Sequence, residues 1–313
     1  MTHRSVPTGN GMRQVPVSLE AKKGEFNEIP IIDLAQDQTV SAAELRDACT
    51  RVGFFYVKNH GVPEDLIDDV WKVAKDFFAL PLEEKMEIEL HKTPNMRGYT
   101  PMYGENVDPS SRPDAHEAFD FGSDTTSMYN MDGVPGKNVW PSSLPKTQIT
   151  LDDYFKKINE LGHRLLQLFS LSLSLPIDAL QSIANPPSSI ARILHYPPHE
   201  SEKEVSPDQI GIGSHTDYEL FTILLQQQGI KALQVLNRHG EWISAEPIPN
   251  TLVVNVGDMM QRITNDKYVS TIHRAINQSG RERYSSPVFF GANYEVTLEA
   301  GDYLKERFEA TYK

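Results

Sequence analysis

The chain has 313 residues, a formal net charge of −13 and a pI of about 5.2. An acidic surface repels phosphate backbones, so we expect no nucleic-acid partner. No apolar run is long enough to span a bilayer, and residues 1–27 lack the apolar stretch of a secretory signal, so we expect no membrane association. The single cysteine, Cys49, allows no internal disulfide, which predicts a reducing, cytoplasmic location.

The first part of the chain predicts helices mixed with short strands. Residues 1–27 are polar and contain glycine, proline and lysine, which indicates a flexible N-terminal arm. Ser41 followed by Glu44 is typical of a capping box, so a helix should begin there. Further strands are expected at residues 29–34, 53–57 and 117–122, and further helices at residues 63–78 and 151–175. Residues 28–185 should together form a helical and mixed region that packs on a later barrel.

Residues 93–112 predict a long irregular loop, because they are rich in proline, glycine, asparagine and tyrosine. Such loops within a compact domain often serve function. Tyr99 and Tyr103 are therefore candidates to line a substrate pocket. The alternative is that these aromatic side chains pin the loop to the core.

The second part of the chain changes to short strands with glycine and proline between them. They are expected at residues 189–196, 210–217, 221–226, 232–236, 241–245, 251–256, 270–276 and 283–290. Eight evenly spaced strands indicate a jelly roll or a barrel, which residues 186–295 would form. A C-terminal helix is expected within residues 296–313. The fold class is thus mainly β with flanking helices.

His215 and Asp217 lie two residues apart, so on a strand both side chains leave the same face of the sheet. His273 lies in a later strand-like segment. Two histidines and one carboxylate on one side of a metal leave three positions open, which suits non-haem Fe(II). Arg283 and Ser285 alternate with Tyr284, so they too share a face, where a guanidinium and a hydroxyl can hold a carboxylate.

This set of residues resembles the isopenicillin N synthase-like family of Fe(II)- and 2-oxoglutarate-dependent dioxygenases. Residues 53–63, Gly-Phe-Phe-Tyr-Val-Lys-Asn-His-Gly-Val-Pro, resemble the family's N-terminal signature, and residues 100–106 resemble fungal-type members. The resemblance implies a double-stranded β-helix (jelly-roll) core with an N-terminal α/β region. It also implies Fe(II), 2-oxoglutarate and O2 as cofactor and co-substrates.

Individual roles follow from the resemblance alone. It implies that Fe(II) is bound by His215, Asp217 and His273, and that 2-oxoglutarate is held by Arg283, Ser285 and Tyr196. The expected reaction hydroxylates, desaturates or cyclises a small organic molecule, in secondary metabolism.

Three further residues are candidates for substrate contact. Arg192 is four residues before Tyr196 and shares its strand face, so it would either pair with the substrate or form a salt bridge on the barrel. Tyr218 adjoins Asp217 and would lie at the pocket rim. Phe289 lies on the same predicted strand as Arg283.

Two other functions fit the same residues. One is an oxidase like isopenicillin N synthase, whose substrate carboxylate occupies the Arg283 site without 2-oxoglutarate. The other is a binding barrel that stores a ligand without turnover. Succinate formation would separate the dioxygenase from the oxidase. We expect a monomer or a homodimer.

Overall fold

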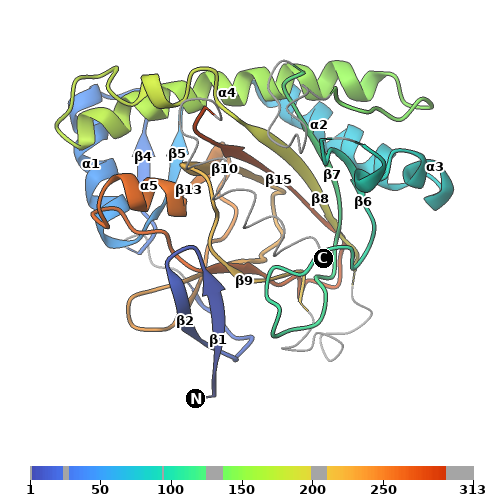
Figure 1. Cartoon of the computed structure of the whole chain (residues 1–313), viewed down its shortest axis with the longest axis horizontal. Coiled ribbons are helices and arrows are strands. Elements are labelled where there is room, and N and C mark those ends of the chain that lie inside the picture. Colours follow the sequence, from blue (N-terminus) through green and yellow to red (C-terminus); the bar gives the residue numbers. More distant parts are fainter. Residues whose placement is uncertain (1, 24–27, 94, 125–136, 199–209, 294–313) are drawn as a thin grey trace.

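The centre of the molecule is a pair of β-sheets that face each other, shown in the computed structural model (Figure 1). The structure describes residues 2–23, 28–93, 95–124, 137–198 and 210–293. The predicted C-terminal helix lies outside these described residues. Within them, no helix is long and apolar enough to cross a membrane.

The larger sheet has eight strands. In spatial order they are β4 (Ile31–Asp33), β5 (Phe54–Lys58), β13 (Thr251–Val256), β10 (Phe221–Gln226), β15 (Arg283–Phe290), β8 (Ile190–Tyr196), β7 (Glu117–Gly122) and β6 (Gly98–Thr100). The smaller sheet runs β3 (Lys22–Lys23), β12 (Trp242–Ser244), β11 (Leu233–Leu236), β14 (His273–Ala275) and β9 (Ile212–His215).

The eight strands predicted in the second part of the chain are all present, and they divide equally between the two sheets. The larger sheet takes β8, β10, β13 and β15, and the smaller takes β9, β11, β12 and β14. This confirms the jelly-roll prediction. The N-terminal region does more than pack on that core, because β4 to β7 extend both edges of the larger sheet.

Helices cover the outer face of the larger sheet. They are α1 (Gln38–Arg51), α2 (Glu64–Phe78), α3 (Leu82–Glu87) and the long α4 (Lys146–Ser172), which runs across the top of Figure 1. The apolar stripe of α4 is buried at Leu151, Tyr154, Ile158, Leu161 and Leu165. Each fully buried leucine contributes about 2 kcal/mol of hydrophobic stabilisation, which explains why this helix lies flat on the sheet.

The first helix begins earlier than the capping box predicted. The carboxylate of Asp37 accepts a hydrogen bond from the backbone N–H of Thr39 at 2.8 Å and therefore caps α1. Ser41 is buried one turn further on, where its hydroxyl donates to the Asp33 carbonyl at 3.1 Å. Aspartate and serine both cap helices well, so the local sequence did not show whether Asp37 or Ser41 is the N-cap of α1.

The arm that was expected to be flexible folds as a β-hairpin, so that prediction was wrong for residues 3–16. The strands are β1 (His3–Thr8) and β2 (Gly11–Pro16), joined at Gly9 and Asn10. Val6 and Val15 are fully buried against Trp242 and Ile272 of the core. The polar composition concealed this hairpin, because its apolar contacts with the core come from two valines whose partners lie far along the chain.

Alternation along the strands separates the core from a cavity. On β8, Ala191 and Ile193 face the helices, whereas Arg192 and Leu194 face the space between the sheets. Near β5 and β13 that space is filled by apolar side chains: Phe54, Tyr56, Leu233, Val235, Ile243 and Val253. Towards β8 and β15 it remains open. The short elements η1 (Leu90–Lys92), η2 (Gln181–Ile183) and α5 (Asp258–Ile263) complete the described fold.

Candidate active site

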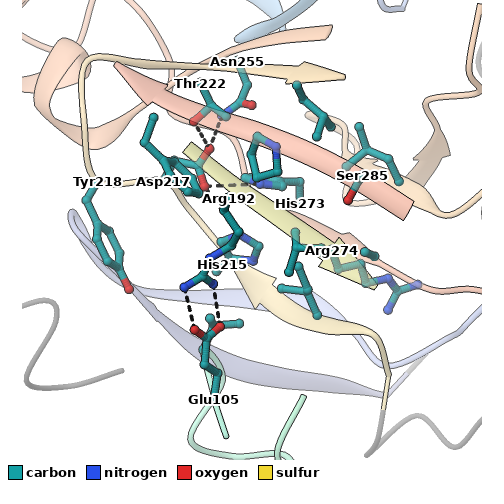
Figure 2. A pocket seen from close by; sticks show the side chains of 18 of the residues that line it. Glu105, Arg192, His215, Asp217, Tyr218, Thr222, Asn255, His273, Arg274 and Ser285 are labelled. Carbon is teal, nitrogen blue, oxygen red and sulfur yellow. Dashed lines mark hydrogen bonds and ion pairs between the residues drawn. The ribbon is translucent and has the colours of Figure 1, made fainter. Parts of the chain in front are cut away.

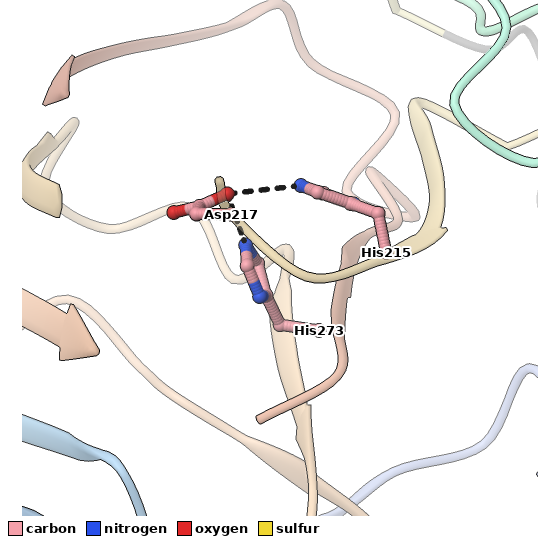
Figure 3. A group of neighbouring side chains, drawn as sticks. All are labelled: His215, Asp217 and His273. Atoms are coloured by element: carbon pink, nitrogen blue, oxygen red, sulfur yellow. Dashed lines mark ion pairs between the residues drawn. The ribbon is translucent and has the colours of Figure 1, made fainter. Parts of the chain in front are cut away.

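Two strand ends of the smaller sheet bring His215, Asp217 and His273 together (Figure 3). His215 ends β9 and lies opposite His273, the first residue of β14. Nε2 of each histidine is 3.5 Å from Oδ1 of Asp217. The strand expected to run through residue 217 stops at His215, so the following turn, rather than strand alternation, aims Asp217 at the histidines.

Each histidine is oriented by its own main chain. Nδ1 of His215 donates to the carbonyl of Gly213 at 2.8 Å, and Nδ1 of His273 donates to the carbonyl of Thr271 at 3.1 Å. A carbonyl can only accept, so the proton is on Nδ1 and the lone pair of Nε2 points to the shared space. This tautomer is the one that metal-binding histidines use.

The carboxylate of Asp217 is also fixed. Its Oδ2 accepts hydrogen bonds from the hydroxyl of Thr222 and from Nδ2 of Asn255, the latter at 2.7 Å (Figure 2). Burial opposes its ionisation. When no metal is bound and the two imidazoles are protonated on Nε2 as well, the charge of His273 and the hydrogen bonds from His215 and His273 outweigh burial and hold the pKa of Asp217 well below its ordinary value. Oδ1 of the ionised carboxylate therefore faces the two histidines.

The donor set fits a divalent iron ion. One ligand atom from each of the three side chains lies within 4.8 Å of the other two, which is close enough to hold a metal ion. Among the histidine, cysteine and carboxylate side chains of the described residues, these three form such a group. Two imidazoles and one carboxylate on one side, with a cavity on the other, match the three-ligand arrangement of non-haem Fe(II).

A tight turn supports the loop that carries Asp217. A Cβ on Gly257 would lie 2.1 Å from the Glu219 carbonyl oxygen, so the backbone approach requires glycine. Next to it, the N–H of Asp258 donates to the Asp217 carbonyl at 2.8 Å, and Oδ2 of Asp258 accepts from the Thr216 hydroxyl at 2.9 Å. Helix α5 begins at this turn, with Gly257 as its N-cap.

Arg283 lies at one end of the cavity, beside Tyr196 on the neighbouring strand. Its guanidinium carbon is 4.6 Å from the centre of the Tyr196 ring, and its Nη1 donates to the Ser285 hydroxyl at 3.3 Å. Arg283 is only 1% exposed, and no carboxylate among the described residues forms a salt bridge with it. Its Nε is also buried without a hydrogen-bond partner. A buried cation of this kind is costly unless an anion joins it, so the position fits a carboxylate ligand.

The cavity between the sheets has a volume of about 130 Å³ (Figure 2). The three metal-site residues, Arg283, Ser285 and Tyr196 all line it, as do three of the predicted substrate contacts, Arg192, Tyr218 and Phe289.

The other two predicted substrate contacts, Tyr99 and Tyr103, do not line the cavity. Tyr99 is 1% exposed, packs edge-on against Phe77 and donates its hydroxyl to Glu117 at 2.6 Å. It therefore pins this segment to the core, which was the alternative interpretation. Contrary to the prediction, the segment is not irregular throughout, because Gly98–Thr100 form β6. Tyr103 is 52% exposed to solvent. Sequence spacing did not reveal which face of this irregular loop turns inward.

Arg192 forms a salt bridge, which was the predicted alternative to a contact with the substrate. Its Nη1 and Nη2 donate to both oxygens of Glu105 at 2.7 Å, and its Nε and Nη2 donate to Asp120 at 2.7 and 2.9 Å. Both acids line the cavity, and neither was singled out from the sequence. Asp120 alternates with two phenylalanines on β7, which is a signal for an inward polar position. Glu105 comes from the loop, 87 residues before Arg192, and offers no such signal.

Two family models match the chain. Residues 29–143 match the N-terminal region of the non-haem dioxygenases in morphine synthesis, and residues 187–292 match the 2OG-Fe(II) oxygenase superfamily. The chain belongs to the 2-oxoglutarate- and Fe(II)-dependent oxygenases. Members of this superfamily use Fe(II), 2-oxoglutarate and O2, so the enzyme is a non-haem iron dioxygenase with the cofactors that the sequence predicted.

Named relatives of this oxygenase come from plants and fungi. A homoarginine-6-hydroxylase of Oryza sativa subsp. japonica is 35% identical, with 90% of this chain and 91% of that protein covered. The oxidoreductase ppzC of Metarhizium majus (strain ARSEF 297) is 37% identical, covering 85% and 78%. A Neurospora crassa protein whose crystal structure holds alpha-KG and thymine has a TM-score of 0.76 at 30% identity, covering 85% of this chain and 86% of that one. These comparisons favour the 2-oxoglutarate-dependent reaction over the oxidase alternative.

Proposed function

We propose that this oxygenase binds Fe(II) through His215, Asp217 and His273 and binds 2-oxoglutarate through Arg283. The observation that carries the proposal is the buried, uncompensated guanidinium of Arg283 in the same cavity as the three metal-type ligands. When bound, Fe(II) and 2-oxoglutarate activate O2 for the oxidation of a substrate C–H bond, with succinate and carbon dioxide as co-products.

The surrounding residues position the co-substrate and exclude water. We assign the hydroxyls of Ser285 and Tyr196 as further donors to the carboxylate that Arg283 holds, because all three line one end of the cavity. Leu194 and Ala275 form an apolar wall beside Tyr196. A dry wall strengthens the charge pairing at Arg283 and keeps water from the reacting atoms.

The proposed substrate is a small organic molecule of secondary metabolism that contacts Tyr218 and Phe289. Relatives are named for the 6-hydroxylation of homoarginine, and a structural relative was crystallised with thymine, so members of this size act on small polar molecules. Hydroxylation is accordingly the proposed default outcome. A cytoplasmic location and a monomeric or homodimeric state are proposed with it.

An anaerobic titration tests the assignment. The apoprotein is titrated with Fe(II) and then with 2-oxoglutarate, while the weak visible charge-transfer band of a chelated keto acid is recorded. A band that saturates at one equivalent supports the proposal. Iron binding without a band would contradict the role of Arg283, and no iron binding would contradict the three-ligand site.

A further inference from the structure

A chain of buried ion pairs forms one wall of the cavity. Arg192 donates to both oxygens of Asp120 and to both oxygens of Glu105, and all three side chains line the cavity. Figure 2 shows the pair of Arg192 and Glu105. His116 extends the chain beyond Glu105, with its Nε2 3.2 Å from Oε2 of that carboxylate. His116 is 2% exposed and does not itself line the cavity.

The contacts of His116 require a proton on both ring nitrogens. Nδ1 donates to the Gly211 carbonyl at 2.8 Å, because a carbonyl can only accept. Nε2 faces Glu105. Burial opposes ionisation of Glu105, but the charge of Arg192 holds its pKa well below the ordinary value, so this carboxylate also only accepts. His116 is therefore an imidazolium. Burial lowers its pKa, but the hydrogen bond and the charge of Glu105 outweigh burial and raise it above the ordinary 6.5.

The proton on His116 balances the charges of the chain. Glu105 and Asp120 each contribute one negative charge, and Arg192 and His116 each contribute one positive charge. Without the proton, two carboxylates share one guanidinium, and one buried negative charge is left uncompensated. A buried charge without a partner is strongly destabilising, so the arrangement depends on the imidazolium.

No other group around the ring can supply that positive charge. Among the described residues, the remaining titratable groups that face His116 are Asp114 of the same loop and Tyr196 of β8, whose ring centre is 5.8 Å away. The two oxygens of Asp114 accept from the N–H groups of Gly213 and Val107 at 2.7 and 3.0 Å. Burial raises the pKa of Tyr196, so its hydroxyl stays neutral.

His116 is the last residue of a loop that borders the cavity. Residues 101–116 lie between β6 and β7 and form no helix or strand, and we name them the cavity loop. Glu105 and Val107 of this loop line the cavity, and the N–H of Asp114 donates to the Glu105 carbonyl at 2.8 Å. Because Arg192 and His116 hold the side chain of Glu105, the position of the cavity loop depends on their charges.

We propose that protonated His116 is a positioning residue, which keeps Glu105 and Arg192 in the cavity wall and so holds the cavity loop against the cavity. Loss of the proton releases Glu105 and loosens the loop. The proposal goes beyond the proposed function and rests on it for the statement that this cavity holds the substrate. Since the pKa of His116 is raised, its contribution is complete below pH 6.5 and is lost as the pH rises through the raised value.

Hydrogen exchange, measured by mass spectrometry, tests this role. The full chain is loaded anaerobically with Fe(II) and 2-oxoglutarate. Exchange of the peptides that cover residues 101–116 is followed between pH 6 and 9, and each rate is divided by the intrinsic rate at that pH. In the unmodified protein, protection of the cavity loop should fall about tenfold or more as the pH rises above 6.5, because a hydrogen bond between charged groups is lost.

Variants assign this change to one ion pair. His116→Gln leaves a carboxylate uncompensated at every pH, so its cavity loop should be poorly protected throughout. Glu105→Gln removes that carboxylate, so protection should no longer depend on pH. His163→Gln is the matched control, because His163 is a half-buried histidine of α4 whose Nδ1 lies 3.0 Å from the side-chain oxygen of Gln181. It should keep the profile of the unmodified protein.

The outcomes separate this proposal from the proposed function. If the visible band with 2-oxoglutarate is absent, the proposed function itself fails. If the band forms but protection of the cavity loop does not change with pH, only the role of His116 is overturned. A change with pH that persists in His116→Gln or in Glu105→Gln would likewise overturn it. Exchange of α4 reports whether each variant is folded, and if His116→Gln also loses protection there, Glu105→Gln decides.

Discussion

Replacing Arg283 with glutamine should weaken 2-oxoglutarate binding while leaving iron bound. Arg283 is 1% exposed, so its pairing with a carboxylate is desolvated, and loss of one partner costs about 2–5 kcal/mol. A free-energy difference of 1.4 kcal/mol changes Kd tenfold, so the Kd for 2-oxoglutarate should increase by a factor between about 30 and several thousand. The assay is the anaerobic charge-transfer titration, with the Kd for Fe(II) measured separately.

Adjacent serines provide the control for this experiment. Ser285 lines the cavity, whereas the buried Ser286 does not, and the main-chain carbonyl of Ser286 accepts from the Tyr154 hydroxyl of α4 at 3.4 Å. Ser285→Ala removes a neutral hydrogen bond of about 1 kcal/mol and should weaken 2-oxoglutarate about fivefold. Ser286→Ala should have no such effect. An Arg283→Gln protein that binds 2-oxoglutarate as tightly as the parent would refute the assignment.

Three further predictions concern the metal loop and its neighbours. His273→Ala should abolish stoichiometric Fe(II) binding and turnover together, and retained activity would exclude it as a ligand. Asn255→Leu leaves Oδ2 of Asp217 short of a donor and should weaken Fe(II) about 10- to 100-fold, as measured by competition with a chelator. Burial raises the pKa of Asp114 to about 6, above its ordinary 3.8, so its contribution to stability is complete at low pH and is lost as the pH rises through about 4 to 6. The free energy of unfolding of Asp114→Asn, measured in urea, should therefore rise by up to about 3 kcal/mol relative to that of the unmodified protein as the pH goes from 4 to 7. If the difference between the two free energies does not change with pH, Asp114 is not the titrating group.

The sequence predicted the features that depend on local repetition. Alternation located the eight jelly-roll strands, and the spacing of His215, Asp217 and His273 located the group that could hold a metal. Other features depend on distant partners. The pairing of Glu105 with Arg192 joins a loop to a strand across 87 residues, and no local pattern encodes it. The prediction that Tyr99 and Tyr103 face the cavity was wrong for the same reason, because the partners that set the direction of these side chains lie elsewhere in the chain.

The N-terminal hairpin also has a consequence for how the chain folds. Its turn donates the N–H of Gly9 to Asp258 at 2.9 Å, and Arg4 pairs with Asp108 at 3.0 Å. Residues of this hairpin thus complete a support for the metal loop, although Gly9 and Asp258 are 249 residues apart in the sequence. Contacts of such long sequence separation form late and slow folding. Correct placement of the metal loop therefore depends on contacts from both halves of the chain.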